Sequence, residues 1–302
     1  NKLRRLISTR DISSLMPMLC IIAWEDDIAG LNIVNNVVSF VEAEKELVNM
    51  QVGNTKVKVK YSARNLDIYI VSTDTVFLEG IEELTSKYEA IAFASRHESR
   101  SKMPVLSIHV PGNLTGEAKF GGKPFSLCYA NGMLMIELFK RIYDAYEQSP
   151  FPRMGWECCY EATHHGPYVN EKPAFYIEIG SSPEEWKNER AGAILAEALV
   201  SVSTMTFNNA SMVGVSGLHY ASNLARKCMR RDMPLGHIIP RYAVEALSED
   251  RERLALAIRE TVDKSLGFKG FVMEKKALKS AHKKVFMEVL REEYPHAPLV
   301  RI

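Results

Sequence analysis

Short apolar segments alternate along this chain with longer segments of helical periodicity, and this alternation limits the fold more than any other feature. The run Ala90-Ile91-Ala92-Phe93-Ala94 is apolar at every position, which is typical of a strand covered on both faces. Strands of this kind alternate with helices in α/β proteins. The sequence therefore predicts an α/β fold with a mixed, largely parallel sheet flanked by helices.

The element boundaries follow from the same periodicity. The predicted strands cover residues 18–24, 55–62, 66–72, 89–95, 104–110, 156–163, 173–179 and 211–216. The predicted helices cover residues 27–49, 78–87, 132–148, 183–205, 220–231, 243–265 and 274–293. The fourth helix has a clear start, because Ser182 precedes Pro183 and Glu185 follows three residues after the serine. The glycine-rich residues 112–130 predict a long loop.

The domain organisation is predicted from the absence of a linker. At 302 residues the chain has room for one large or two ordinary domains. Because no segment of distinct composition divides it, we expect residues 18–302 to form one composite domain with a helical C-terminal part. Residues 1–17 are expected to form an N-terminal extension.

Charge and cysteine content exclude several function classes. The net charge is only +1, so nucleic-acid binding would need a local basic patch. No apolar run reaches the ~18 residues that span a bilayer, so no membrane contact is expected. The five cysteines are odd in number and form no C-x-x-C pair. This pattern favours reduced thiols in a cytoplasmic protein. The chain is expected to be a monomer or a weak homo-oligomer.

Histidines concentrate in segments punctuated by glycine or proline, where α/β proteins place their sites. The densest such segment is the run Glu161-Ala162-Thr163-His164-His165-Gly166-Pro167. Imidazoles and carboxylates are zinc ligands, and catalytic zinc sites keep one position open. The expected zinc ligands are His97, His109, His164 and His219. A structural role for His165 or His237 remains the alternative.

Acid–base chemistry is assigned to the same run. If the strand continues to residue 163, Glu161 and Thr163 share one face, because strand residues alternate sides. Glu161 is then a metal ligand or the general base for a water. Alternatively, this carboxylate only orients an imidazole. The expected catalytic residues are Glu161, Thr163, His164 and His165.

Basic and glycine-rich segments are candidate phosphate contacts. Arginine and lysine beside serines, as in residues 95–102, suit an anion. The Gly-Gly-Lys at 121–123 is weaker evidence, since it matches neither a P-loop nor a dinucleotide fingerprint. Basic residues on the helix predicted at 220–231 form either a local patch that binds nucleic acid or a helix face that is simply solvated. The expected substrate contacts are Arg96, Arg100, Lys102, Asn113, Gly121, Gly122, Lys123, Arg226 and Lys227.

Together, these segments resemble the archaeal and plant type of D-aminoacyl-tRNA deacylase. The motifs appear in the family's order and cover roughly residues 18 to 245. They are Ser95-Arg96-His97-Glu98-Ser99, His109-Val110-Pro111-Gly112-Asn113, Phe120-Gly121-Gly122, Glu161 to Pro167, Glu178-Ile179-Gly180-Ser181, Glu185-Trp186, Gly217-Leu218-His219-Tyr220 and Gly236-His237-Ile238. The Thr-His-His-Gly-Pro portion is the most specific.

The resemblance implies a fold related to peptidyl-tRNA hydrolase and the nucleoside phosphorylases. It also implies a zinc-containing esterase that removes D-amino acids from mischarged tRNA. In our hypothesis Glu161 accepts a proton from water, and Thr163 or His165 donates to the leaving ribose oxygen or positions the amino group. In a metal-free version, His164 is the base and Asn113 orients the ester.

Three other functions compete with this interpretation. A zinc amidase or peptidase acting on a small substrate would use the same ligands but leave the basic clusters without a task. A nucleoside phosphorylase would need phosphate and no metal. A tRNA-binding module without catalysis would not need histidines beside Glu161.

Overall fold

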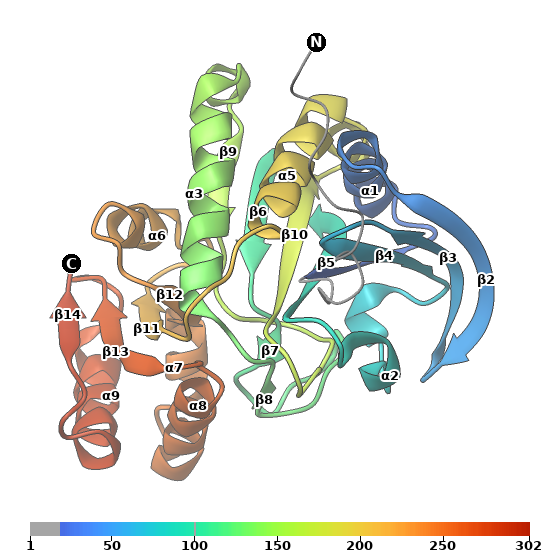
Figure 1. Cartoon of the computed structure of the whole chain (residues 1–302). Helices are drawn as coiled ribbons and strands as arrows, with labels where there is room; N and C mark the ends of the chain where they lie inside the picture. The colour runs from blue at the N-terminus through green and yellow to red at the C-terminus, as the bar shows by residue number, and fades with distance from the viewer. Residues whose placement is uncertain (1–18, 100) are drawn as a thin grey trace, which may run out of the picture.

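Two sheets organise the computed structural model, which describes residues 19–99 and 101–302 (Figure 1). The predicted extension, residues 1–17, lies outside the described residues. The larger sheet has eight strands in the order β2-β3-β4-β1-β5-β10-β6-β9. Its strands are β1 (Leu19–Trp24), β2 (Glu44–Val52), β3 (Thr55–Ser62), β4 (Leu66–Val71), β5 (Ala90–Glu98), β6 (Val105–His109), β9 (Glu157–Tyr160) and β10 (Ala174–Ser181).

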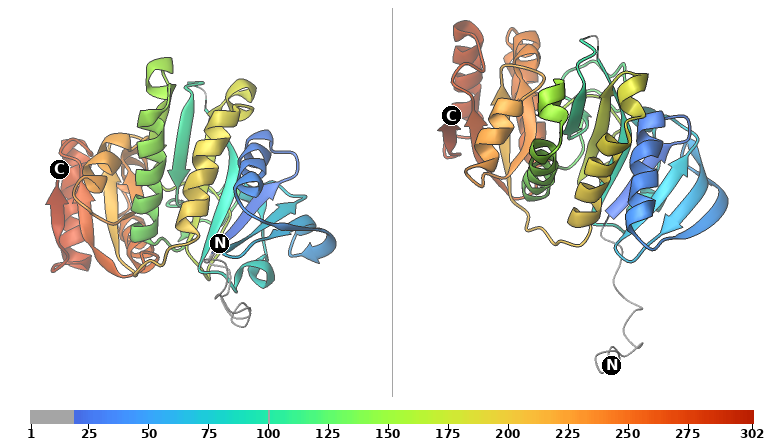
Figure 2. Two further views of the ribbon diagram at one scale, coloured as in Figure 1. Left: turned by 45° about the horizontal axis from the view of Figure 1, so that its top comes forward. Right: turned by 90° about the horizontal axis from the view of Figure 1, so that it is seen from above.

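The centre of this sheet is parallel and covered on both faces. Strands β4, β1, β5 and β10 run parallel, whereas β6 pairs antiparallel with β10, and β2 with β3. Along β1, Ile21 packs into one core cluster and Ile22 into another. Figure 2 shows α1 (Ile28–Phe40), α3 (Gly132–Gln148) and α5 (Glu189–Val202) side by side along one face. The predicted α/β class with a mixed, largely parallel sheet is therefore confirmed.

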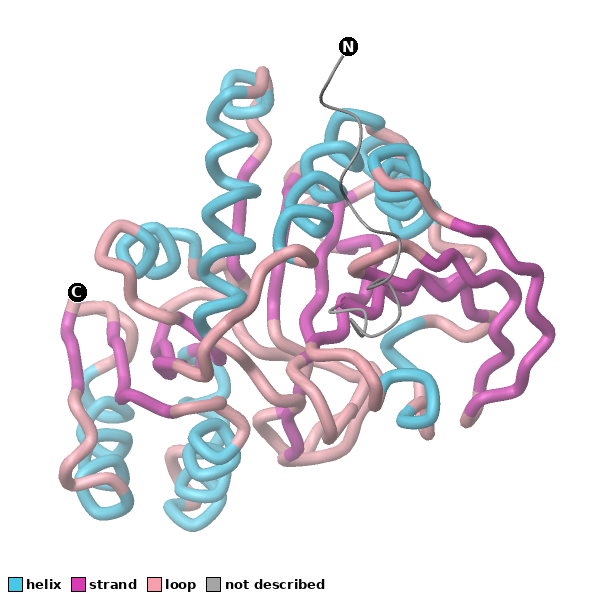
Figure 3. Tube along the Cα trace, viewed as in Figure 1, coloured by secondary structure: helices cyan, strands magenta, loops and turns pink. Residues whose placement is uncertain are grey.

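The second sheet contains four parallel strands in the order β12-β11-β13-β14. These strands are β11 (Ser211–Ser216), β12 (Leu235–Pro240), β13 (Phe268–Met273) and β14 (Leu299–Arg301). Helices accompany them, namely α6 (Ser222–Met229), α7 (Arg241–Leu247), α8 (Arg251–Asp263) and α9 (Ser280–Glu293). The remaining elements are β7 (Gly112–Asn113), β8 (Ser126–Leu127), α2 (Glu82–Thr85) and α4 (Pro183–Trp186), with short 3-10 turns at Thr75–Phe77 and Phe151–Met154. Loops gather around β7 and β8, between the two sheets (Figure 3).

Several predicted boundaries were wrong where tertiary pairing overrides local propensity. The helix predicted at 27–49 ends at Phe40, and residues 44–52 form the edge strand β2. Helix-forming residues such as Glu44 and Lys45 concealed this strand, which pairs with β3 through a tight turn at Gly53 (φ 52°). Strands β12, β13 and β14 were also missed, so the part beyond residue 245, expected to be helical, contains strands as well.

Two long helices predicted as continuous are each divided. The helix predicted at 183–205 breaks before α5, where the Asn188 side chain accepts a hydrogen bond from the Ala191 N–H. The helix predicted at 243–265 divides into α7 and α8, and the Asp250 side chain caps the second. Asn and Asp favour N-cap positions because their side chains satisfy otherwise unpaired backbone donors.

No helix within the described ranges combines the length and apolar character needed to cross a bilayer.

Close packing of α1 on α5 depends on Gly192. A Cβ atom at this position would lie 2.2 Å from Oδ1 of Asn32. The Asn32 amide meanwhile donates to the carbonyls of Trp186 and Asn188, at 2.9 Å each. We expect Gly192→Val to lower the free energy of unfolding by roughly 1–3 kcal/mol through overpacking. Urea denaturation measures this loss, with Ala193→Val on the same helix as the control. Equal stability of both variants would contradict the packing argument.

Candidate active site

Four strands bring the site together on one face of the larger sheet. His97 lies on β5, which extends beyond its predicted end at residue 95. His109 is the last residue of β6, and Glu178 lies on β10 between the two. Strand β9 ends at Tyr160, and Glu161 follows directly. Segments far apart in the sequence thus place their polar side chains on one face of the sheet.

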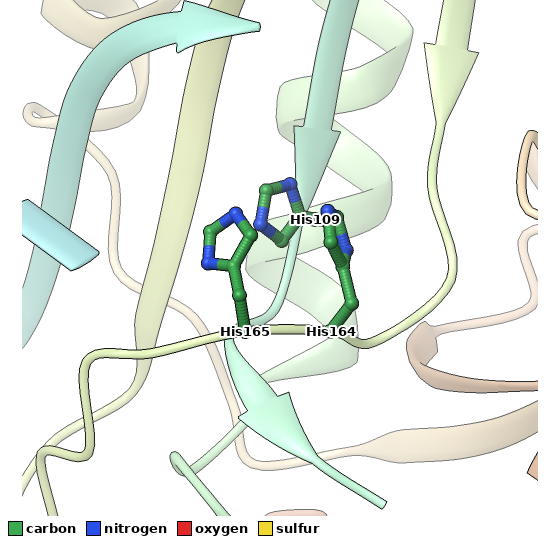
Figure 4. Close-up of side chains that lie close together, drawn as sticks. All are labelled: His109, His164 and His165. Carbon is green, nitrogen blue, oxygen red and sulfur yellow. The ribbon is translucent and has the colours of Figure 1, made fainter. Parts of the chain in front are cut away.

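Three imidazoles form the first cluster, shown in Figure 4. The ring centre of His109 lies 4.1 Å from that of His164 and 4.8 Å from that of His165. His165 has a left-handed backbone (φ 41°). This turn lets two consecutive imidazoles approach His109, which a regular strand would prevent because neighbouring side chains point to opposite faces.

Hydrogen bonds fix the orientation of two of these rings. Nδ1 of His164 donates to the Ala162 carbonyl at 2.8 Å, and Nδ1 of His165 donates to the Gly166 carbonyl at 2.6 Å. In the neutral rings each Nε2 therefore keeps a free lone pair. Both nitrogens of His109 are buried without a hydrogen-bond partner.

Burial keeps the three rings neutral. Desolvation lowers the pKa of His109 and His164 well below the usual histidine value, and neighbouring imidazoles lower both further. Burial likewise lowers the pKa of His165 to about 4. One ligand atom from each ring lies within 4.8 Å of the other two. Neutral imidazoles with free lone pairs are the donor set that zinc binds.

Glu161 is the centre of a second cluster. Its carboxylate is fully buried, and Oε2 lies 2.9 Å from Nε2 of His219 and 3.7 Å from Nε2 of His164. Oε1 lies 3.2 Å from Nδ1 of His97. Burial by itself would raise the pKa of Glu161, but His97 and His219 together outweigh it and lower this pKa. Glu161 is therefore an ionised carboxylate.

His97 and Glu178 form a buried pair beside it. Nδ1 of His97 lies 3.3 Å from Oε2 of Glu178, and Nε2 lies 2.8 Å from the Tyr220 hydroxyl. Burial opposes protonation of His97, but Glu161 and Glu178 raise its pKa to about 9. Burial raises the pKa of Glu178 to about 7, against the effect of His97. His97 thus carries a proton that a metal ligand would have to lose.

These groups border a cavity of about 670 Å³. Its wall includes charged, aromatic and imidazole side chains from both sides of the site. The lining residues are Asp74, Val76, Phe77, Ser95, Arg96, His97, Glu98, Ser99, Phe120, His164, His165, Glu178, His219 and Tyr220. Glu178 reaches this lining, whereas Glu161 lies behind it.

Glu178 was not singled out from the sequence as a site residue. The available signal was a carboxylate inside the otherwise apolar strand Ala174–Ser181. A fully enclosed carboxylate is expensive unless it is paired, so such a residue is a candidate for function.

Thr163 lies apart from the cavity. Because β9 ends early, Thr163 and Glu161 do not share the face that a longer strand would give them. The Thr163 hydroxyl is 3.0 Å from Nδ1 of His237 and accepts from the Ile238 N–H at 3.1 Å. Nε2 of His237 donates to the Cys128 carbonyl at 3.1 Å. These bonds join the two sheets behind the histidines.

The predicted anion contacts are dispersed. Arg96 is paired internally with Asp27 at 3.3 Å and Asp74 at 3.1 Å, and its guanidinium lies over the Trp24 ring. Lys102 is exposed on a turn with φ 49°. Arg100 lies outside the described residues.

The glycine loop is held in a fixed shape. The Asn113 amide donates to the carbonyls of Gly121 at 2.9 Å and Lys123 at 3.3 Å. Gly121 and Gly122 have φ of 73° and 75°, which glycine adopts without strain. Lys123 lies over the Tyr168 ring, 4.8 Å from its centre.

Arg226 and Lys227 lie on α6 and are half-buried, outside the cavity lining.

Comparison with known proteins agrees with the motifs. Residues 84–295 match the family described as D-aminoacyl-tRNA deacylase. The D-aminoacyl-tRNA deacylase of Archaeoglobus fulgidus is 31% identical over 279 residues, which cover 90% of this chain and 92% of that protein. The Pyrococcus horikoshii protein of the same name is 38% identical over 237 residues, which cover 75% of this chain and 81% of that protein.

Similarity is higher over shorter stretches. The D-aminoacyl-tRNA deacylase of Pyrococcus abyssi is 44% identical over 164 residues, or 54% of this chain and 58% of that protein's length. The crystal structure of a conserved protein of unknown function superposes with a TM-score of 0.76 at 28% identity, covering 94% of this chain and 95% of the other. The chain therefore belongs to the D-aminoacyl-tRNA deacylase family, as its motifs predicted.

Proposed function

We propose that this chain hydrolyses the ester bond of D-aminoacyl-tRNA and releases the free D-amino acid and tRNA. The observation that carries the proposal is the cavity bordered by neutral imidazoles and the buried carboxylate of Glu178 in a chain of this family. A tRNA substrate also fits the cytoplasmic location predicted from the sequence. The zinc amidase or peptidase alternative is not favoured, because the named relatives are deacylases.

We further propose zinc as the cofactor, held by His109, His164 and His165. Support comes from the two unpartnered nitrogens of His109 and the free Nε2 lone pairs of the other two rings. When bound, zinc supplies Lewis-acid chemistry to an ester hydrolysis. This set differs from the one expected from the sequence, since His97 is protonated and His219 is hydrogen-bonded to Glu161.

The two carboxylates have different roles in this mechanism. Glu178 lines the cavity, so we assign it the role of general base, which accepts a proton from the attacking water. The same carboxyl group then donates this proton to the leaving ribose oxygen. Glu161 is enclosed and orients His219, the second role that the sequence had left open for it. Protonated His97 lies between Glu161 and Glu178, where its charge offsets the repulsion between the two carboxylates. Its Nε2–H donates to the Tyr220 hydroxyl at the cavity wall.

The proton-transfer role of Glu178 is tested by Glu178→Gln, which keeps the shape and removes the base. We expect kcat for D-tyrosyl-tRNA deacylation to fall by about 10²–10⁴-fold. The measurement is release of D-tyrosine in a single turnover, with L-tyrosyl-tRNA as the substrate control. Glu98→Gln is the matched variant, because Glu98 borders the same cavity but is exposed. Retention of wild-type kcat by a folded Glu178→Gln would remove Glu178 from the mechanism.

Metal dependence is tested with His109→Ala. We expect the variant to lose bound zinc, measured by elemental analysis, together with D-tyrosyl-tRNA hydrolysis. Chelation of the wild type should have the same effect, reversed by added zinc. His282→Ala, in α9 outside the cavity lining, is the control and should keep its metal. D-ester hydrolysis that survives complete zinc removal would support the function and overturn the metal assignment.

Thr163→Val distinguishes a structural from a catalytic hydroxyl. The substitution leaves a buried His237 nitrogen and the Ile238 N–H without a partner, which costs roughly 1–3 kcal/mol. We expect a lower Tm with kcat preserved below that temperature, and recovery of Tm in Thr163→Ser. A hundredfold loss of kcat in folded Thr163→Val would instead restore the predicted catalytic role.

A further inference from the structure

Two aromatic side chains line the cavity but have no role in the proposed mechanism. Phe77 is 46% exposed and Phe120 is 69% exposed, although both line the same cavity as His164 and His165. Large exposed aromatic rings beside a catalytic cavity are costly to hydrate and present open π faces.

The backbone beneath both rings is tightly fixed. The Phe120 carbonyl accepts a hydrogen bond from the Gly166 N–H at 2.9 Å, so Phe120 is joined to the residue next to His165. A Cβ at Gly121 would lie 1.7 Å from the Val76 carbonyl, which shows how closely the two aromatic segments approach. The Phe77 carbonyl accepts from the Asn54 amide at 2.7 Å. The backbone that carries the two rings is therefore fixed before any ligand arrives.

The substrate has one group that must come close to these two rings. The hydrolysed ester is attached to the ribose of the terminal adenosine, so the adenine lies one sugar away from the carbonyl carbon. The terminal nucleotides of tRNA are unpaired, and proteins bind unpaired bases by stacking them on aromatic rings. We propose that Phe77 and Phe120 form the platform on which the terminal adenine of the tRNA stacks, an inference that rests on the proposed deacylase function.

An alternative occupant is the side chain of the D-amino acid. The exposure of Phe120 favours the base, because side-chain recognition needs an enclosed apolar pocket, and Phe120 is 69% exposed. The two occupants differ in what a substitution changes. Loss of a platform for the base weakens the binding of every aminoacyl-tRNA by the same factor. Loss of a side-chain pocket weakens binding by a factor that depends on the amino-acid side chain.

The test compares Phe77→Ala, Phe120→Ala and Phe120→Tyr, with Phe40→Ala as the matched control. Phe40 is 49% exposed at the end of α1 and does not line the cavity. Deacylation of D-tyrosyl-tRNA and D-alanyl-tRNA gives kcat and KM for each protein. Inhibition by adenosine 5′-monophosphate reports on the base site without the amino acid.

We expect both alanine variants to raise KM about tenfold for the two substrates alike, with kcat nearly unchanged. Phe120→Tyr, which keeps a ring, should behave as the wild type, and adenosine 5′-monophosphate should inhibit the alanine variants less. Unchanged KM in both alanine variants, a loss confined to D-tyrosyl-tRNA, or an equal inhibition of all variants would overturn the inference. A wild type that hydrolyses neither D-ester would instead overturn the proposed function.

Discussion

The buried carboxylate of Glu161 is the interaction on which the rest of the site depends. This carboxylate, which follows β9, pairs with imidazoles from two other segments, namely His97 on β5 and His219 after β11. An enclosed charge is costly unless it is paired, so the three segments are held together wherever Glu161 is ionised. The Ala162 N–H, which donates to the His219 carbonyl at 2.8 Å, adds a backbone link between the same segments.

The histidines of the site differ in protonation state because of this arrangement. His97 lies between two carboxylates and holds a proton, whereas His109, His164 and His165 lie mainly among other imidazoles and stay neutral. Histidine thus supplies both a buried cation, at His97, and neutral rings with free lone pairs nearby. The surroundings of each ring, and not the ring itself, decide which role it takes.

The second sheet contributes to the site through its loops. His219 and Tyr220 follow β11, and His237 on β12 receives the Thr163 hydroxyl behind the cluster. The C-terminal strands therefore support the chemistry of the larger sheet. The sequence-based prediction missed β12 and β13, which lie between segments of strong helical periodicity, and so missed this support.

The sequence by itself determined the α/β class, the cores of the eight strands predicted from it, and the family, through the run from Glu161 to Pro167. These are local properties, since apolar spacing and motif order are read within a short window. Tertiary structure alone decided that β2 is a strand, that Thr163 turns away from Glu161, and that Glu178 reaches the cavity. It also decided the protonation of His97. Pairing partners and burial arise from residues distant in the chain, and both the strand pairing of residues 44–52 and the pKa of a buried group depend on them.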